Sequence, residues 1–148
     1  MNLKFESEVK RLGLISGFYD LKNIVDWAED LIAQEDEISE YGIFDVVAGI
    51  NWPVNQMSLE LKNISGASFQ YEQVKATLFS LFLEEAKNSN FGARKIASCL
   101  ANLGAIIEGS PELTSFKDQY DDLDAGIYGC ESEIRAEVIG FLKAAFTE

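Results

Sequence analysis

The chain contains no histidine and few basic residues. Of its 148 residues, 25 are acidic and 12 are basic, which gives a formal net charge of -13 at pH 7. The lack of histidine removes the commonest general base and metal ligand of proteins. The excess of negative charge favours a basic partner surface, or imitation of a polyanion, over work on an acidic substrate. The composition therefore favours a binding protein over an enzyme.

Prolines, cysteines and long apolar runs are also scarce. The two prolines are Pro53 and Pro111, so long stretches are free to form helix. Cys99 lies in an apolar helical run far from Cys130, which predicts a buried thiol rather than a disulfide. No run approaches the roughly 18–20 apolar residues that span a bilayer, and the first residues lack a signal-peptide pattern. We therefore expect a cytoplasmic protein without a membrane segment.

The apolar residues that are present recur at helical spacing. They make up 47% of the chain, enough for one domain with a buried core. The segment 43–48 is either a short buried strand or a helical turn, and its neighbours favour the helix. We expect an all-α fold, a compact bundle or short helical-hairpin stack of six to eight helices in a single domain spanning 1–148. The predicted helices cover about 2–13, 21–32, 53–64, 69–88, 91–107 and 131–146.

Four positions in the first half of the chain predict helix ends. Gly13 is expected to follow the first helix as its C′ residue. Asp20 is expected to cap the second helix, and Pro53 to occupy the first position of a later one. The Ser65–Gly66 pair is expected to stop that later helix.

The acidic residues are concentrated in two blocks. Residues 26–45 hold eight acids and no basic residue, and residues 118–137 hold seven acids with Arg135, whereas residues 73–107 carry a net charge of +2. Both blocks also contain aromatic residues with polar groups, including Trp27, a type enriched at protein interfaces. The simple interpretation is a pair of solvated helix faces. We favour the other, a recognition surface for a basic protein.

Motifs of catalysis and metal binding are missing. Without histidine there is no Ser/His or Cys/His arrangement, and there is no CxxC pair, HExxH helix or GxxxxGK[ST] loop. The carboxylates of 118–124 resemble a metal-binding cluster only superficially. An EF-hand loop starting at Asp122 would place Ile127 where glycine is required. We therefore expect no catalytic residue, no metal and no cofactor.

The first third of the chain carries a sequence resemblance. The segment GLISGFYDLKNIVDWAEDLI (13–32), followed by the apolar stretch 43–50, resembles the immunity proteins of bacterial polymorphic-toxin and contact-dependent growth-inhibition systems. The resemblance implies a cytosolic protein that binds one toxin domain, often a nuclease, and blocks its active site or substrate groove. These families share no catalytic residues, so no residue role follows from the resemblance.

The sequence thus leads to one main hypothesis and three alternatives. The main hypothesis is an immunity-type inhibitor, monomeric alone and heterodimeric with a cognate basic toxin domain, with no direct contact to nucleic acid or membrane. The alternatives are a DNA-mimicking inhibitor of a DNA-binding complex, a helical protein-interaction scaffold and, last, an enzyme. In the main hypothesis the predicted partner-binding residues are Asp26, Glu29, Asp30, Glu37, Glu40, Tyr41, Tyr120, Asp121, Asp122 and Asp124.

Overall fold

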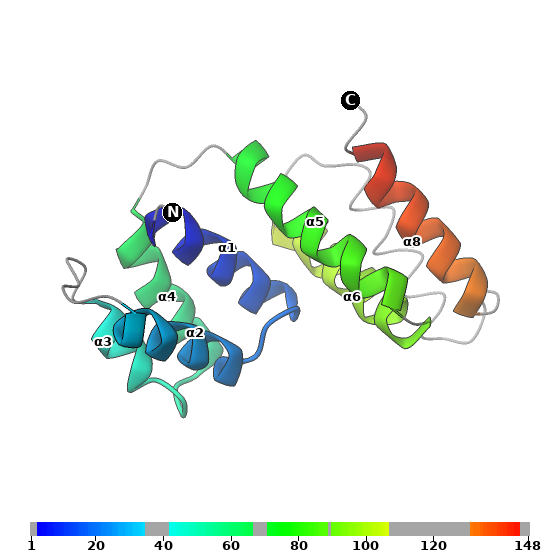
Figure 1. The fold of residues 1–148 in the computed structure, drawn as a ribbon. Coiled ribbons are helices and arrows are strands. Elements are labelled where there is room, and N and C mark those ends of the chain that lie inside the picture. Colours follow the sequence, from blue (N-terminus) through cyan, green and yellow to red (C-terminus); the bar gives the residue numbers. More distant parts are fainter. Residues whose placement is uncertain (1–2, 35–41, 67–70, 89, 107–130, 146–148) are drawn as a thin grey trace. The chain divides into compact units, whose positions relative to one another are not determined.

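A computed structural model describes residues 3–34, 42–66, 71–88, 90–106 and 131–145 of the chain (Figure 1). Within these ranges there are seven α-helices and no strand, which confirms the predicted all-α class. Segment 43–48 is helical up to Val47, in agreement with the helix favoured from its neighbours. The helices are α1 (Leu3–Ser16), α2 (Leu21–Gln34), α3 (Gly42–Val47), α4 (Val54–Ser65), α5 (Tyr71–Asn88), α6 (Asn90–Ile106) and α8 (Glu131–Ala145).

The chain divides into two compact units. The first unit comprises Met1–Ile15 and Tyr19–Val74, and so contains nearly all of α1 and the whole of α2, α3 and α4. The second unit comprises Ser16–Phe18 and Lys75–Glu148, and contains most of α5 with α6 and α8. The single domain expected over 1–148 stays a prediction.

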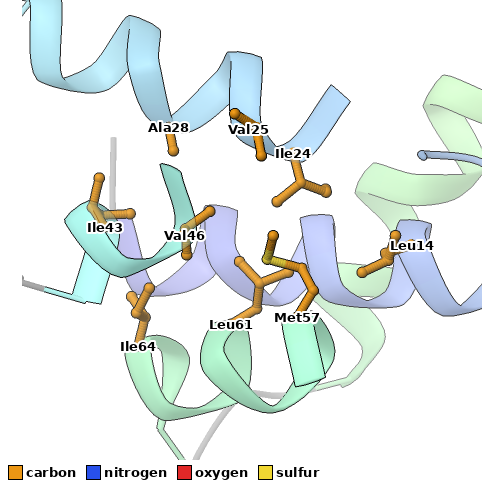
Figure 2. Close-up of a cluster of buried hydrophobic side chains, with 9 residues drawn as sticks. All are labelled: Leu14, Ile24, Val25, Ala28, Ile43, Val46, Met57, Leu61 and Ile64. Carbon is orange, nitrogen blue, oxygen red and sulfur yellow. The ribbon is translucent and has the colours of Figure 1, made fainter. Parts of the chain in front are cut away.

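The helices of the first unit share one apolar core (Figure 2). Helix α3 packs against both α2 and α4, and the buried side chains of α2 and α4 point toward one another in Figure 2. Full burial of one such aliphatic side chain contributes roughly 1.5–3 kcal/mol. This core therefore holds the helices of the first unit together. Its members are Leu14, Ile24, Val25, Ala28, Ile43, Val46, Met57, Leu61 and Ile64.

The first helix is longer than its sequence predicts. The expectation that it ends at Gly13 is wrong: α1 continues to Ser16, and the glycine with positive φ is Gly17, at +92°. Gly13 instead makes room for Tyr19, because a Cβ at Gly13 would lie 2.3 Å from a ring carbon of Tyr19. The Tyr19 N–H also donates to the Gly13 carbonyl at 3.0 Å. A glycine is required here by close packing, not by backbone conformation.

The ends of α4 agree with their prediction to within one residue. Pro53 lies at the N-cap, with ψ of 147°, and not at the first helical position as expected. Its fixed φ and missing N–H are tolerated equally well at that position, because the first N–H groups of a helix lack intrahelical acceptors. Gly66 ends the helix with φ of +79° and donates its N–H to the Lys62 carbonyl at 2.9 Å. The predicted Ser65–Gly66 stop is confirmed.

An ion pair within α1 is linked to α4 of the first unit by a hydrogen bond from Ser65. The Glu8 carboxylate accepts a hydrogen bond from Arg11 Nε at 2.6 Å and one from Ser65 Oγ at 3.0 Å. A second Arg11 nitrogen also contacts Glu8 Oε1. Buried charges are stable only when they are paired and hydrogen-bonded. These contacts give Glu8 a structural role and account for its burial.

The second unit has an aromatic core. The Phe82 ring of α5 lies 5.0 Å from the Phe18 ring and 6.1 Å from Phe79, and Phe79 lies 6.0 Å from Phe141 of α8. Tilted aromatic pairs at such distances add to the free energy of burial. Phe82 is completely buried, so it occupies the centre of this core. Helix α6 packs against α8 in the same unit.

Polar side chains of the second unit satisfy backbone carbonyls. Arg135 of α8 donates to the Ala86 carbonyl at 3.3 Å and to the Lys87 carbonyl, both in the last turn of α5, where carbonyls lack intrahelical partners. Asn102 Nδ2 donates to the Ser16 carbonyl at 2.7 Å.

Cys99 is a buried free thiol, as predicted. Its burial raises the pKa to about 12, against the smaller opposing effect of Lys95.

Candidate interaction surface

Reciprocal hydrogen bonds fix the start of α2. The Asn23 N–H donates to Asp20 Oδ1 at 2.7 Å, and the Asp20 N–H donates to Asn23 Oδ1 at 2.9 Å. Each bond satisfies a backbone donor at the start of the helix or just before it, as in a capping box. Asp20 therefore caps α2 as predicted, and it fixes where this helix begins.

The outward side of α2 carries three predicted partner-binding residues. Asp26, Glu29 and Asp30 are all exposed, and their spacing of three and four residues places them on one stripe of the helix. Ile24 and Ala28 are fully buried on the opposite side. The structure thus brings these three carboxylates together on the surface of the first unit. We call this set the α2 acidic stripe.

One lysine lies on the same stripe. Lys22 Nζ contacts Asp26 Oδ2 at 2.8 Å, and the hydrogen bond with Asp26 is the largest cause that raises the Lys22 pKa. The two side chains are 75% and 51% exposed, so the pair is solvated and contributes little to stability. Glu29 and Asp20 raise the same pKa more weakly through charge attraction. The stripe remains negative overall because one lysine faces several carboxylates.

The other seven predicted partner-binding residues lie outside the described residues. They belong to the connection that follows α2 and to the segment that precedes α8, and their role stays a prediction. These seven residues are Glu37, Glu40, Tyr41, Tyr120, Asp121, Asp122 and Asp124.

Trp27 is a packing residue as well as a member of the first acidic block. It is half-buried against the core of the first unit, and its Nε1 is enclosed without a hydrogen-bond partner. The Lys10 ammonium lies 5.9 Å from the Trp27 ring and 4.3 Å from the Tyr19 ring, close enough for cation–π attraction. Burial lowers the pKa of Lys10, while Glu6 raises it. This aromatic side chain therefore has an intramolecular cation as its neighbour.

Sequence reasoning did not identify the exposed apolar residues of α3, α4 and the turn between them. Phe44, Ile50, Val54 and Leu59 are 48%, 42%, 44% and 58% exposed. The available signal was the helical spacing of Ile43 and Val46, which buries both and turns Phe44 away from the core. The helical spacing predicts an exposed Phe44 only if 43–48 is a helix. In a strand, alternate residues would share a face, and Ile43 and Val46 would lie on opposite faces.

No structural feature of the described residues points to metal chemistry. In those parts of the chain, no group of three or more cysteine or carboxylate side chains is placed to hold a metal ion. Among the same residues, no helix is both long enough and apolar enough to cross a membrane.

Comparison with known proteins assigns no relative to the chain. No protein-family model, curated protein or solved structure matches it.

Proposed function

We propose that this chain is an immunity-type inhibitor that binds and neutralises a cognate basic toxin domain, with a nuclease as the expected class. The observation that carries the proposal is the α2 acidic stripe, in which Asp26, Glu29 and Asp30 share the exposed side of one capped helix. The location of the complex, in this proposal, is the cytoplasm. No catalytic role is assigned to any residue.

The charge of a nuclease supports this choice of partner. A protein that holds phosphates needs a basic groove, and carboxylates can both attract that groove and occupy the positions of phosphates. Electrostatic attraction of this kind raises association rates up to ~10⁸–10⁹ M⁻¹s⁻¹ at low salt. Fast association suits a protein that must intercept a toxin before the toxin acts.

The test uses the protein domain encoded immediately beside the gene for this chain. Stopped-flow association of the two purified proteins is measured at low and high salt, together with growth of cells that express both. We expect tight binding, an association rate that falls with salt, and restored growth. Absence of binding, or binding without restored growth, would overturn the proposed inhibition.

Charge reversal locates the binding surface. The double variant Glu29→Lys/Asp30→Lys leaves the Lys22–Asp26 pair in place, and we expect at least about tenfold slower association and a weaker dependence on salt. The single variants Asp30→Lys and Glu84→Lys form a matched pair, since both acids are exposed and lie in different units. Equal rates for the two would show that the α2 acidic stripe is not the contact.

Competition with duplex DNA separates this proposal from DNA mimicry. An immunity protein is expected to bind one domain, whereas a DNA mimic would bind several duplex-binding proteins and be displaced from each by DNA. Binding to unrelated duplex-binding proteins with such displacement would replace the proposal by the mimic.

A further inference from the structure

Three exposed apolar side chains lie on α3, on the turn that follows it and at the first residue of α4 in the first unit. We propose that Phe44, Ile50 and Val54, which we call the α3–α4 corner, form the apolar centre at which the basic partner docks. This inference rests on the proposed function, because it takes the same basic protein as the occupant. It goes further by assigning the lifetime of the complex to apolar residues that are not among the predicted acidic contact residues.

Backbone contacts hold the corner in a fixed conformation. The Gly49 N–H donates to the Val46 carbonyl at 2.9 Å, and the Trp52 N–H donates to the Gly49 carbonyl at 3.0 Å. A Cβ at Gly49 would lie 2.4 Å from the Trp52 ring and 2.7 Å from Met57 Cε, so the turn is packed directly against the core. Side chains on an ordered turn lose less entropy when a partner binds.

The exposure of these side chains is not explained by the core of the first unit. Ile43 and Val46 of the same short helix are completely buried, so α3 already contributes its inner side to the core. Among the described residues, five large apolar side chains are exposed, and three of these belong to the corner. Protein interfaces commonly place an apolar centre inside a polar rim, and aromatic residues are enriched in that centre. Phe44 is the candidate anchor.

The surrounding charge indicates what kind of protein covers the corner. Asp45 is exposed beside Phe44, and α3 packs against α2, the helix that carries the α2 acidic stripe. The first unit as a whole contains thirteen acidic and five basic side chains. A second copy of this chain would bring like charges together, whereas a basic surface with an apolar centre complements both features.

The two sets of residues should affect different rate constants. Charges at the rim of an interface act mainly on association and its dependence on salt, whereas buried anchors act mainly on dissociation. We therefore expect substitutions in the α3–α4 corner to raise the dissociation rate of the complex and to leave its association rate nearly unchanged. This separation is the signature of an apolar centre with an acidic rim.

The experiment measures association and dissociation of the full chain with the domain encoded by the neighbouring gene. For Phe44→Ala we expect about tenfold faster dissociation, and for the triple variant Phe44→Ala/Ile50→Ala/Val54→Ala about a hundredfold. The association rate and its salt dependence should change less than about threefold. Circular dichroism should be unchanged, because each side chain is exposed.

Leu59→Ala is the matched control. Leu59 is exposed, lies in the same unit, and sits on α4 opposite the buried Met57 and Leu61. Its dissociation rate should equal that of the unsubstituted chain. Equal dissociation for Phe44→Ala and Leu59→Ala would overturn the assignment of the corner while leaving the proposed function intact.

Two further outcomes also decide the matter. If the unsubstituted chain does not bind the domain at all, the proposed function and the docking inference fall together. If sedimentation shows a dimer of the free chain that Phe44→Ala dissociates, a second copy covers the corner and the inference is overturned.

Discussion

The two units differ in where they place charged and aromatic side chains. The first unit buries an ion pair between Glu8 and Arg11 and exposes apolar residues together with the α2 acidic stripe. The second unit gathers the rings of Phe82, Phe79 and Phe141. Of the five large apolar side chains exposed in the described residues, four belong to the first unit. Among the described residues, the proposed recognition surface therefore lies in the first unit, whereas the described helices of the second unit share a packed aromatic core.

This difference can be tested because the two tryptophans, Trp27 and Trp52, both lie in the first unit. Tryptophan emission therefore reports unfolding of the first unit, while far-UV circular dichroism reports the helices of both. Comparing the two signals in urea shows whether a substitution acts on one unit or on the whole chain.

The largest expected effect comes from the aromatic core. Phe82→Ala removes a completely buried ring that contacts Phe18 and Phe79, and should lower the free energy of unfolding by about 3–5 kcal/mol. Urea titration followed by circular dichroism measures the loss. A change under about 1 kcal/mol would contradict the central position of this ring.

The two signals in the same titration test the domain prediction. Loss of helical signal before loss of tryptophan emission would show that the units unfold separately. Coincident transitions would instead support the predicted single domain.

A slightly smaller effect is expected from the buried ion pair. Glu8→Gln removes the charge that pairs with Arg11 and should lower the free energy of unfolding by about 3 kcal/mol, because a guanidinium that is only 14% exposed is left without a counter-charge. The double variant Glu8→Gln/Arg11→Met should recover part of this loss. Tryptophan emission in urea measures both, and a double variant less stable than the single one would show that the pair is not coupled.

A capping variant should have a more modest effect. Asp20→Ala removes the side-chain acceptor for the Asn23 N–H, and the loss of a helix cap costs about 1 kcal/mol. Asp20→Asn keeps an acceptor and should cost much less. Thermal unfolding followed by tryptophan emission measures the difference, and equal melting temperatures for the two variants would contradict the capping role.

The smallest expected effect is a dependence of stability on pH. Because burial raises the pKa of Cys99 from 9.0 to about 12, the neutral thiol contributes stability that is fully present below about pH 9. This contribution is lost as the pH rises toward the folded-state pKa.

Urea titration at pH 8 and pH 10 isolates this contribution. The chain should lose about 1 kcal/mol more than its Cys99→Ala variant. The variant is the control for every other group that titrates in this range, including Tyr19, whose pKa is also raised by burial. Equal losses would show that the thiol is not buried in solution.

Much of the fold follows from local sequence rules, with particular exceptions. Helical spacing predicted six of the seven described helices to within about three residues at each end, and the cap at Asp20 and the stop at Gly66 are where expected. The end of α1 was missed because Gly13 looks like a terminal glycine until Tyr19 is placed against it. Such a contact between a helix and the residues that follow it leaves no periodic signal.

The candidate surface could be predicted only in part. The spacing of Asp26, Glu29 and Asp30 on an amphipathic helix predicts that they face outward together. The α3–α4 corner could not be found in the same way. The largely apolar stretch 43–50 does not by itself show which of its side chains are buried in the core and which are exposed.

The sequence by itself determined the helical class, the excess of negative charge and the outward side of α2, because spacing, composition and capping are local properties. The tertiary structure alone decided that Glu8 is buried with Ser65, and that Phe44 remains exposed beside a buried Ile43. These outcomes depend on which helix packs against which. The interior is close-packed and has a limited volume, so burial of one side chain depends on residues that are far away in the chain, as the contact between Glu8 and Ser65 shows.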